Sequence, residues 1–595
     1  MNLQEFDILQ TLLTEKADNQ RQIAELSRYS IGVVNRALGV LKSEGMIDDD
    51  YRPTKKARDF ASRHKTKRAV ILAAGFGMRM VPITNECPKG LITLHGEVMI
   101  ERVIRQLKAA GIREIYVVVG FMMERYEYLT EEFGVKLLVC TDYTSKNNLY
   151  SLAVAKEYLE DAYIVPCDLY CYNSPFHGFE FYSWYLTSRE TSDESGLRVT
   201  RGREVLMVED ETEGNKCFGI AYLSKDMAKK TKARLEELTA KGKNSKAFWE
   251  CAITTNKVLD IPARIAGPED AVEINTYSQL RDIEYYNPIL QNESIGIISK
   301  VFGVPYEEIK DVAVMKKGLT NRSFLFTVRG EKYIMRIPGA DTDGYLDRKL
   351  EGRVYDAIRG KGFCDDNIYY DNVKGYKIAK YIENSRVCNE TDPEEMAECM
   401  RLAHKFHDMK IRGGTPLDLY GNIQYMEDQW GGAPSAYKDY EETKKHCWAM
   451  KEFVDANSTI EYLAHGDMNP DNFLVYYENG EKKIQLIDWE YTGVQDPLTD
   501  VAAFATYRKH DRAFVDSVID CYYAEGCSKK QRLLAYCYCS LWALYNSNWC
   551  EYKRTLGVEL GEFALISYQN AKEYYKIFEE EYEKYKSANK KSSRF

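Results

Sequence analysis

Residues 463–490 read LAHGDMNPDNFLVYYENGEKKIQLIDWE, and this stretch decides how the C-terminal half of the chain folds. A His-Gly-Asp triplet ends at Asp467, Asn472 follows five residues later, and Asp488 closes an apolar run. The Asn-Gly pair at 479–480 separates two apolar runs, a pattern typical of a β-hairpin turn. Such a hairpin brings Asn472 and Asp488 to the same end of two short strands.

These three side chains suit phosphoryl transfer from a nucleotide. That reaction needs a carboxylate to hold the attacking hydroxyl, and amide and carboxylate oxygens to hold magnesium on the phosphates. Asp467 is therefore the candidate catalytic base, and Asn472 and Asp488 are the candidate magnesium ligands. The alternative is a polar loop beside an ordinary hairpin. The spacing resembles the Brenner motif and metal-binding aspartate of the aminoglycoside phosphotransferase and choline kinase family, which implies a protein-kinase-like fold.

The same resemblance implies nucleotide contacts earlier in this half. Residues 317–326, KGLTNRSFLF, place a glycine turn and small polar residues between two predicted strands, with Thr320 and Asn321 expected at the phosphates. Arg336 occupies the strand position where many kinases have lysine, and Glu351 is expected to pair with it and orient it on the phosphates. The alternative for this pair is a surface ion pair worth less than about 1 kcal/mol.

Aromatic residues near the C-terminus form a stripe. Trp542, Tyr545 and Trp549 recur at i, i+3 and i+7, so they share one face of a predicted helix. A quaternary ammonium offers no hydrogen bond, and its recognition needs aromatic faces and a carboxylate. Trp489 and Glu490, beside the candidate metal ligand, complete our candidate choline site with this stripe. Taken alone, each aromatic is better explained as part of the core.

A glycine loop follows an apolar strand that begins at Arg68. Residues 72–92 read LAAGFGMRMVPITNECPKGLI, in which glycines allow backbone amides to approach a triphosphate closely. Arg79 and Lys89 supply cations for its phosphates and are the candidate catalytic cations. This stretch resembles the sugar-phosphate nucleotidyltransferase family, and the helices and strands predicted up to residue 139 agree with its Rossmann-like fold. The residues expected at the nucleotide are Leu72, Ala74, Gly75 and Gly77.

Residues 143–152, YTSKNNLYSL, resemble the Asn-Asn-x-Tyr-Ser segment of the bacterial CTP:phosphocholine cytidylyltransferases. The resemblance makes Asn147 and Asn148 candidate ligands of the base or ribose. The alternative is that one of these amides caps the N-terminus of a helix.

Asp168 ends a second apolar strand, where the family holds its magnesium. A carboxylate at the C-terminal end of a parallel strand lies in the ligand crevice of the sheet. The second metal-binding aspartate of the family falls at Asn275 in this chain. An asparagine oxygen binds magnesium more weakly than a carboxylate, and Glu273 is the alternative ligand.

Residues 1–66 predict a small helical module. Its helix, turn and helix, followed by Gly-Met-Ile at 45–47, resemble a winged helix-turn-helix. The expected recognition helix carries only Arg36 and Lys42, and a basic tail follows from Arg52 to Arg68. Two interpretations stay open: weak DNA contact through this module, or a docking and linking role.

Composition narrows the class of protein. A net charge of −10 argues against broad coating of nucleic acid. Fifteen scattered cysteines are typical of reduced thiols in a cytosolic protein. No uncharged apolar run is long enough to cross a bilayer, and the start of the chain has no signal-peptide pattern. We therefore expect a cytoplasmic protein without membrane insertion.

The sequence thus predicts a multidomain α/β and α+β protein with domains at 1–66, 67–293 and 294–595. The resemblances imply a bifunctional enzyme that uses Mg²⁺. Its C-terminal domain is expected to phosphorylate choline with ATP, and its middle domain to join phosphocholine to CTP, releasing pyrophosphate and CDP-choline. One alternative is the same chemistry on ethanolamine or aminoethylphosphonate. Another is a DNA-binding regulator that senses choline metabolites. The oligomeric state is left open.

Overall fold

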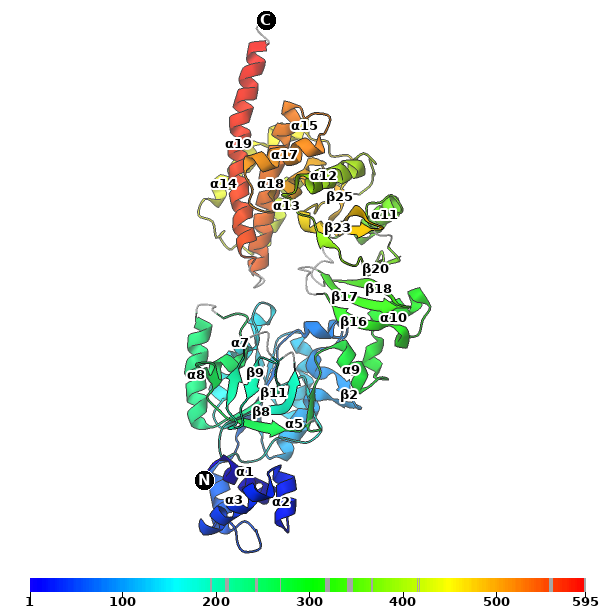
Figure 1. The fold of residues 1–595 in the computed structure, drawn as a ribbon. Helices are drawn as coiled ribbons and strands as arrows, with labels where there is room; N and C mark the ends of the chain where they lie inside the picture. The colour runs from blue at the N-terminus through cyan, green and yellow to red at the C-terminus, as the bar shows by residue number, and fades with distance from the viewer. Residues whose placement is uncertain are drawn as a thin grey trace. The chain divides into compact units, whose positions relative to one another are not determined.

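A computed structural model of the chain divides it into two compact units, residues 1–292 and residues 293–595 (Figure 1). The first two of the three domains predicted from the sequence therefore lie in one unit. The structure describes residues 1–192, 195–208, 213–240, 244–267, 269–315, 321–339, 346–364, 367–414, 416, 418–555 and 560–592.

Residues 1–66, here called the N-terminal module, form four helices around a small core that includes Ile8, Leu9 and Leu38. Gly-Met-Ile at 45–47 contributes only one bridge, between Ile47 and Pro53. The middle of the basic tail, Lys55–Arg63, forms the fourth helix. The winged helix-turn-helix assignment stays a prediction. The helices are α1 (Leu3–Thr14), α2 (Gln20–Ser27), α3 (Ile31–Ser43) and α4 (Lys55–Arg63).

A seven-stranded sheet forms the centre of the nucleotidyltransferase part. Side chains alternate along its strands, so Ala69 and Ile71 enter one core while Val70 and Leu72 enter another on the opposite face. The predicted alternation of strands and helices is confirmed, with β1, β4, β5 and β6 parallel. In spatial order the strands are β14 (Ala263–Ala266), β8 (Trp184–Ser192), β11 (Gly214–Leu223), β6 (Ala162–Pro166), β1 (Arg68–Ala73), β4 (Glu114–Val119) and β5 (Lys136–Val139).

Smaller elements surround this sheet. A two-stranded antiparallel ribbon, β7 (Leu169–Cys171) with β15 (Ala271–Glu273), continues from β6. The other short strands are β2 (Thr93–Leu94), β3 (Glu97–Val98), β9 (Leu197–Val199), β10 (Val205–Met207), β12 (Thr254–Thr255) and β13 (Val258–Leu259). The helices are α5 (Met99–Ala109), α6 (Tyr128–Phe133), α7 (Asn148–Val154), α8 (Lys225–Thr239) and α9 (Tyr277–Ile283).

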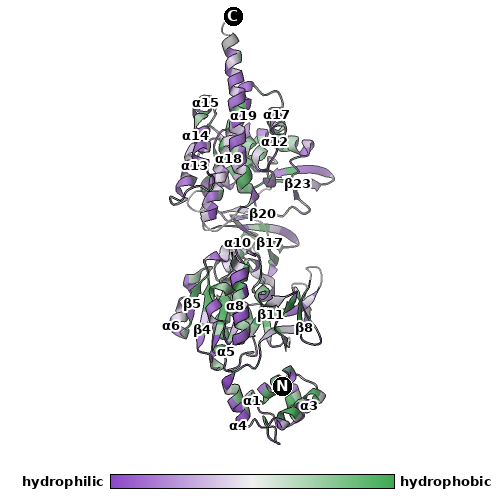
Figure 2. Cartoon of the chain, turned by 90° about the vertical axis from the view of Figure 1, so that its left-hand side faces the viewer, coloured by the Kyte–Doolittle hydropathy of each residue, from purple (hydrophilic) through white to green (hydrophobic). Residues whose placement is uncertain are grey.

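Helix α8 illustrates how the helices cover the sheet. It buries Met227, Ala228, Thr231 and Leu235, which recur on one face, and leaves its charged residues outward. Figure 2 shows the same alternation of hydrophobic and hydrophilic colour along α8.

The second unit begins with one helix, followed by a five-stranded antiparallel sheet whose third and fourth strands along the chain are joined by a second helix, the arrangement of a protein-kinase-like N-terminal lobe. In spatial order its strands are β16 (Lys310–Val314), β17 (Asn321–Val328), β18 (Glu331–Pro338), β20 (Lys377–Lys380) and β19 (Tyr369–Tyr370). The helices of this part are α10 (Glu293–Phe302) and α11 (Arg348–Ile358).

The rest of this unit is mainly helical around one large core. Its helices are α12 (Pro393–His407), α13 (Leu419–Asp428), α14 (Tyr440–Ala449), α15 (Lys451–Asn457), α16 (Leu498–Thr506), α17 (Arg512–Tyr522), α18 (Lys529–Thr555) and α19 (Glu562–Ser592). Its strands are β21 (Arg386–Val387), β22 (Leu463–Ala464), β23 (Phe473–Glu478), β24 (Glu481–Leu486) and β25 (Gly493–Val494).

The predicted hairpin is present as β23 and β24, which turn at Asn479 and Gly480, both with positive φ. In the described part of the chain, no helix is long and apolar enough to cross a membrane.

Candidate active sites

The glycine loop after β1 packs tightly against the residues that follow it. Gly77 has a φ of 70°, and a Cβ atom there would lie 3.1 Å from the Thr84 methyl carbon. Any larger residue at this position would therefore meet both backbone strain and a steric conflict. Thr84 also donates a hydrogen bond to the Gly77 carbonyl at 3.1 Å, which fixes the loop beside Lys89.

Lys89 lies at the centre of the first candidate site. Its buried ammonium donates to Oδ2 of Asp168 at 2.6 Å and to Oδ1 of Asn275 at 2.7 Å. Burial and the charge of Asp168 raise the pKa of Glu273, while a hydrogen bond with Asn275 and the charges of Lys89 and Arg79 oppose that shift. Five polar residues predicted from separate motifs are thus brought together.

The ribbon explains how residues so far apart in sequence meet. Asp168 directly precedes β7, and Glu273 at the end of β15 pairs with Leu169 at the start of β7. The backbone amide of Ile274 also donates to the Asp168 carbonyl at 3.0 Å. Antiparallel pairing therefore sets Asp168, Glu273 and Asn275 at one end of the ribbon.

The two candidate nucleotide amides, Asn147 and Asn148, hold a neighbouring segment. Asn147 caps α7, accepting from the Asn148 amide at 2.8 Å, and donates to the Lys246 carbonyl at 3.1 Å. The side-chain oxygen of Asn148 accepts from the backbone amide of Trp249 at 2.8 Å. The helix-cap alternative is therefore present, and both amides position residues 245–249.

Glu250 is a candidate site residue of the nucleotidyltransferase part that the sequence did not predict. One of its carboxylate oxygens accepts from the Tyr185 hydroxyl at 2.8 Å, and the other is buried without a hydrogen-bond partner among the described residues. Burial raises the pKa of Glu250 to about 6. The sequence signal was its position directly after Phe248 and Trp249, two aromatics in a nucleotidyltransferase domain. Trp249 itself is buried in the core.

The second candidate site has Asp467 at its centre. Asn472 donates to its carboxylate at 3.1 Å and to its carbonyl at 2.7 Å, and Asn469 donates to the other carboxylate oxygen at 2.9 Å. Burial raises the pKa of Asp467 to about 8, and the negative charge of Asp488 adds to that effect while the two amides oppose it. Asp488 has a φ of 66°, a conformation often found at functional sites.

Asp500 supports the loop that carries Asp467. It accepts from the backbone amides of His465 at 2.7 Å and Gly466 at 2.9 Å, and His407 contacts it at 2.9 Å. Burial lowers the pKa of His465, which agrees with a neutral ring that donates to the Ile487 carbonyl at 3.0 Å. The imidazole thereby ties the loop of the base to the strand that leads to Asp488.

Arg336 and Glu351 form a buried pair, 2.6 Å apart, rather than a surface pair. The guanidinium also lies 3.5 Å from Asp488. Burial alone would raise the pKa of Glu351, but the charges of Arg336 and Lys377, with hydrogen bonds from Tyr370 and Arg336, together lower it. Glu490 belongs to the same cluster, because it lies 3.2 Å from Arg348 and 3.7 Å from Arg336. This arrangement ties the cation of β18 to both α11 and the loop after β24.

Two residues expected at the choline lie elsewhere. Trp489 is completely buried, packs on Phe406 and His465, and donates to the Leu486 carbonyl at 2.9 Å. Glu490 is held by the arginines described above. Neither lines the cavity beside Asp467, so this part of the predicted choline site is corrected.

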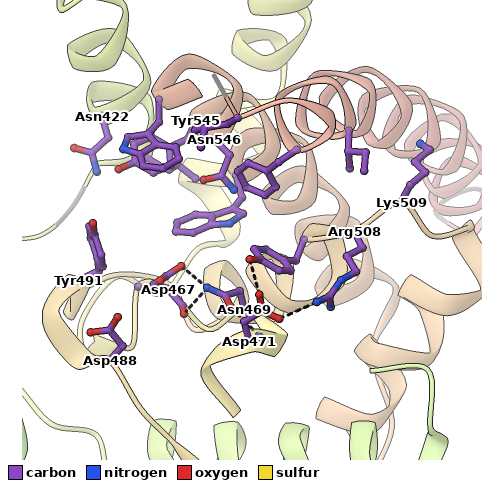
Figure 3. Close-up of a pocket in the computed structure, with 18 of the residues that line it drawn as sticks. Asn422, Asp467, Asn469, Asp471, Asp488, Tyr491, Arg508, Lys509, Tyr545 and Asn546 are labelled. Atoms are coloured by element: carbon purple, nitrogen blue, oxygen red, sulfur yellow. Dashed lines mark hydrogen bonds and ion pairs between the residues drawn. The ribbon is translucent and has the colours of Figure 1, made fainter. Parts of the chain in front are cut away.

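A cavity of about 690 Å³ opens above Asp467 and Asp488, and the aromatic stripe of α18 forms its opposite wall (Figure 3). Tyr545 and Asn546 lie across from the two carboxylates in this view. Residues that the sequence did not predict, among them Asn422, Arg508 and Lys509, also line the cavity. The aromatic lining residues are Tyr491, Tyr507, Trp542, Tyr545, Trp549 and Phe563.

Thr320, predicted at the phosphates, lies outside the described residues. Asn321 begins β17 and pairs with Pro338 in the register of the sheet. Among the described residues, no group of three or more His, Cys, Asp or Glu side chains could hold a metal ion. Both candidate magnesium sites instead combine carboxylates with an asparagine.

Two family models match separate stretches of the chain. Residues 69–178 match the family model of the MobA-like NTP transferase domain, and residues 312–532 match that of choline/ethanolamine kinase.

Three relatives each align with less than half of the chain. The choline-phosphate cytidylyltransferase of Streptococcus pneumoniae is 29% identical over 231 residues, which is 38% of this chain and all of that protein. The 2-aminoethylphosphonate cytidylyltransferase of Lancefieldella rimae is 29% identical, over 38% of this chain and 94% of its own length. Protein LicA of Haemophilus influenzae is 21% identical, over 42% of this chain and 95% of its own length. The chain is therefore an enzyme in which a nucleotidyltransferase domain is fused to a kinase domain.

Proposed function

We propose that this chain makes CDP-choline in two steps. Its kinase domain phosphorylates choline with ATP, and its nucleotidyltransferase domain transfers a cytidylyl group from CTP to phosphocholine, releasing pyrophosphate. The observation that carries the proposal is the kinase cavity, in which a candidate base faces an aromatic wall. The second reaction consumes the product of the first, which gives the fusion a chemical reason. Both reactions use nucleotide triphosphates, so we assign them to the cytoplasm.

In the kinase step, Asp467 accepts the proton of the choline hydroxyl. Hydrogen bonds from Asn469 and Asn472 hold its carboxylate in position for this proton. Arg336, oriented by Glu351, contacts the nucleotide phosphates. Aromatic faces of Trp542, Tyr545 and Trp549 attract the trimethylammonium group, which places the hydroxyl beside Asp467.

In the cytidylyl step, a phosphate oxygen of phosphocholine forms a bond to the α-phosphorus of CTP, and the bond to the pyrophosphate breaks. The backbone of the loop at Gly75 and Gly77 approaches the triphosphate, and Arg79 and Lys89 stabilise the charge that develops there. Leu72 and Ala74, at the start of that loop, contact the nucleotide. Asn147 and Asn148 hold the segment 245–249 in place, and this segment positions the nucleotide.

Mg²⁺ fits both sites. In the first, Oδ1 of Asp168 is buried without a hydrogen-bond partner among the described residues, and Glu273 lies beside it. Because Lys89 already occupies the oxygen of Asn275, Glu273 is the better second ligand. In the second, Asn472 and Asp488 would hold the ion. When bound, Mg²⁺ neutralises phosphate charge in both reactions.

A quaternary head group agrees better with the cavity than a primary amine. Ethanolamine or aminoethylphosphonate would need several hydrogen-bond acceptors around the nitrogen, whereas this wall is aromatic. Of the acids in the lining, Asp471 is already paired with Arg508 at 2.8 Å.

The test is incubation of the full chain with choline, ATP, CTP and Mg²⁺, followed by mass analysis. We expect phosphocholine when CTP is omitted and CDP-choline when it is present. With ATP omitted, added phosphocholine should still give CDP-choline. Parallel reactions with ethanolamine and 2-aminoethylphosphonate set the specificity. A faster reaction with either of these amines than with choline would overturn the choice of head group.

A further inference from the structure

The N-terminal module is attached to the nucleotidyltransferase domain by polar contacts on several elements. We propose that it is a docked part of the cytidylyltransferase that holds the ribbon β7–β15 in place, with Arg28 as a positioning residue. Two polar sets of contacts and one apolar set attach the module to the domain, and Arg28 connects them to the ribbon.

The first set meets at Asp7 on α1. Its carboxylate accepts from Arg203 at 2.7 Å, from the Tyr29 hydroxyl at 2.7 Å, and from the hydroxyl of Tyr182. The carboxylate is only 14% exposed and the Arg203 side chain 20%. Separating the module would leave Asp7 without Arg203 and Tyr182, and Arg203 without Asp7, which is costly for partly buried ions.

The second set joins Gln10 of α1 to β14 and to the segment before β8. Arg264 donates to Oε1 of Gln10 at 3.0 Å and to Glu180 at 2.8 Å, and Gln10 donates to the Phe179 carbonyl at 3.0 Å. Both polar atoms of the Gln10 amide are therefore used across the interface. Glu180 is fully buried, so the network is part of the interior of this unit.

The third set is apolar. Phe181, from the nucleotidyltransferase domain, packs against the core of the module, with its ring 5.5 Å from that of Phe6 and 5.2 Å from that of Phe60. A phenylalanine of one part thus completes the core of the other. The module and the domain therefore share a packed apolar contact in addition to the polar ones.

Arg28, in the turn between α2 and α3, connects this interface to the first candidate site. Its guanidinium makes two hydrogen bonds to Asp270, one of them 2.9 Å long, and a third to Glu269 at 2.8 Å. Asp270 also accepts from Asn173 at 3.0 Å and from the amide of Gly267 at 2.7 Å. Asp270 directly precedes β15, so Arg28 and Asn173 hold one end of the ribbon.

The other end of the ribbon carries Asp168, Glu273 and Asn275. Each strand has three residues, so the two ends are only about 10 Å apart. A shift of the held end would move Glu273 relative to Asp168, and the relative position of these two carboxylates decides how well a metal ion fits. Arg28 therefore acts on cytidylyl transfer through the ribbon, without contact to the substrate.

The test compares the full chain with Arg28→Ala, and with Arg36→Ala as the matched control. Arg36 is an exposed arginine on α3 of the same module. Hydrogen exchange is measured in peptides that cover 169–173 and 271–275. We expect exchange there to be about 3- to 10-fold faster in Arg28→Ala and unchanged in Arg36→Ala, as for the loss of one partly exposed ion pair. Unchanged exchange in Arg28→Ala would overturn the proposal.

A second measurement rests on the proposed function and separates positioning from general loss of structure. We expect Arg28→Ala to raise the Mg²⁺ concentration for half-maximal pyrophosphate release by about 3-fold or more, with Arg28→Lys intermediate. Choline phosphorylation by the same sample reports an intact kinase domain. If the wild-type chain releases no pyrophosphate from CTP and phosphocholine, the proposed function fails, while the exchange result still decides this proposal. An equal fall in rate at every Mg²⁺ concentration would contradict a role through the metal site.

Discussion

The ammonium of Lys89 donates a hydrogen bond to the side-chain oxygen of Asn275, and the two atoms are 2.7 Å apart. An aspartate at this position would offer the same oxygen and an added negative charge close to Asp168 and Glu273. The asparagine thus reduces the number of acids around one buried lysine.

We expect Asn275→Asp to be tolerated and to lower the Mg²⁺ concentration needed for half-maximal cytidylyl transfer, because it adds a negative charge and an oxygen not held by Lys89 beside Asp168 and Glu273. The measurement is pyrophosphate release against Mg²⁺ concentration, with choline phosphorylation as the internal control. A severe loss of activity would show that the site depends on the neutral amide.

Lys89→Ala should slow cytidylyl transfer by about 100-fold or more, as expected for loss of a charged contact in the transition state. The kinase rate of the same sample should stay near that of the wild type. Since Lys89 also contacts Asp168 and Asn275, a Lys89→Arg variant shows whether a cation alone suffices. An unchanged transferase rate in Lys89→Ala would remove this residue from the active site.

Asp467→Asn should slow choline phosphorylation by about 1,000-fold or more, because the variant has no base for the hydroxyl proton. Synthesis of CDP-choline from added phosphocholine should be unaffected, since Asp467 belongs to the other unit. Both rates are measured by product mass. A parallel loss of both activities in a folded variant would contradict the assignment of two separate sites.

Trp542 and Trp489 provide a test of the corrected choline site. Trp542→Ala should raise the KM for choline by about 10-fold, because it removes one aromatic face from the cavity wall. Trp489 lies in the core, so Trp489→Ala should instead destabilise the fold by about 3–5 kcal/mol. Steady-state kinetics and thermal unfolding of both variants distinguish the two roles. An effect on KM from Trp489→Phe, with unchanged stability, would return Trp489 to the cavity.

Local spacing predicted some of the second candidate site well and some of it poorly. Asp467, Asn472 and Asp488 meet because a short hairpin joins them, and a hairpin is specified by its own turn residues. Trp489 and Glu490 follow Asp488 directly, but chain adjacency does not determine side-chain direction. The left-handed backbone at Asp488 begins a short 3₁₀ turn, and both side chains are buried there.

The sequence patterns could not predict contacts between distant segments of the chain. The pair Asp7 and Arg203 joins α1 to a loop almost two hundred residues later, and neither residue belongs to a motif. The sequence predicted a separate domain at residues 1–66. The interface with Phe181 and Arg264 indicates that removal of these residues would expose part of the nucleotidyltransferase domain.

Glu250 gives a prediction for the dependence of stability on pH. Burial raises its pKa to about 6 from 4.5. The folded chain therefore binds this proton more tightly than the unfolded chain. The contribution to stability is fully present below about pH 4.5 and is lost as the pH rises through about 6. A shift of this size corresponds to a loss of about 2 kcal/mol.

Glu250→Gln keeps an acceptor for the Tyr185 hydroxyl and has no charge to bury, so it should avoid this loss. We expect its unfolding free energy, relative to that of the wild type, to increase by about 1–2 kcal/mol between pH 4.5 and pH 7. Calorimetry on the full chain measures this free energy. CTP should stabilise the unit that binds it, so the unfolding transition that CTP shifts belongs to the unit that contains Glu250. Glu237→Gln, at an exposed position on α8, is the control and should follow the wild type at every pH. If the Glu250→Gln and wild-type curves run parallel across this range, the buried carboxylate does not titrate as described.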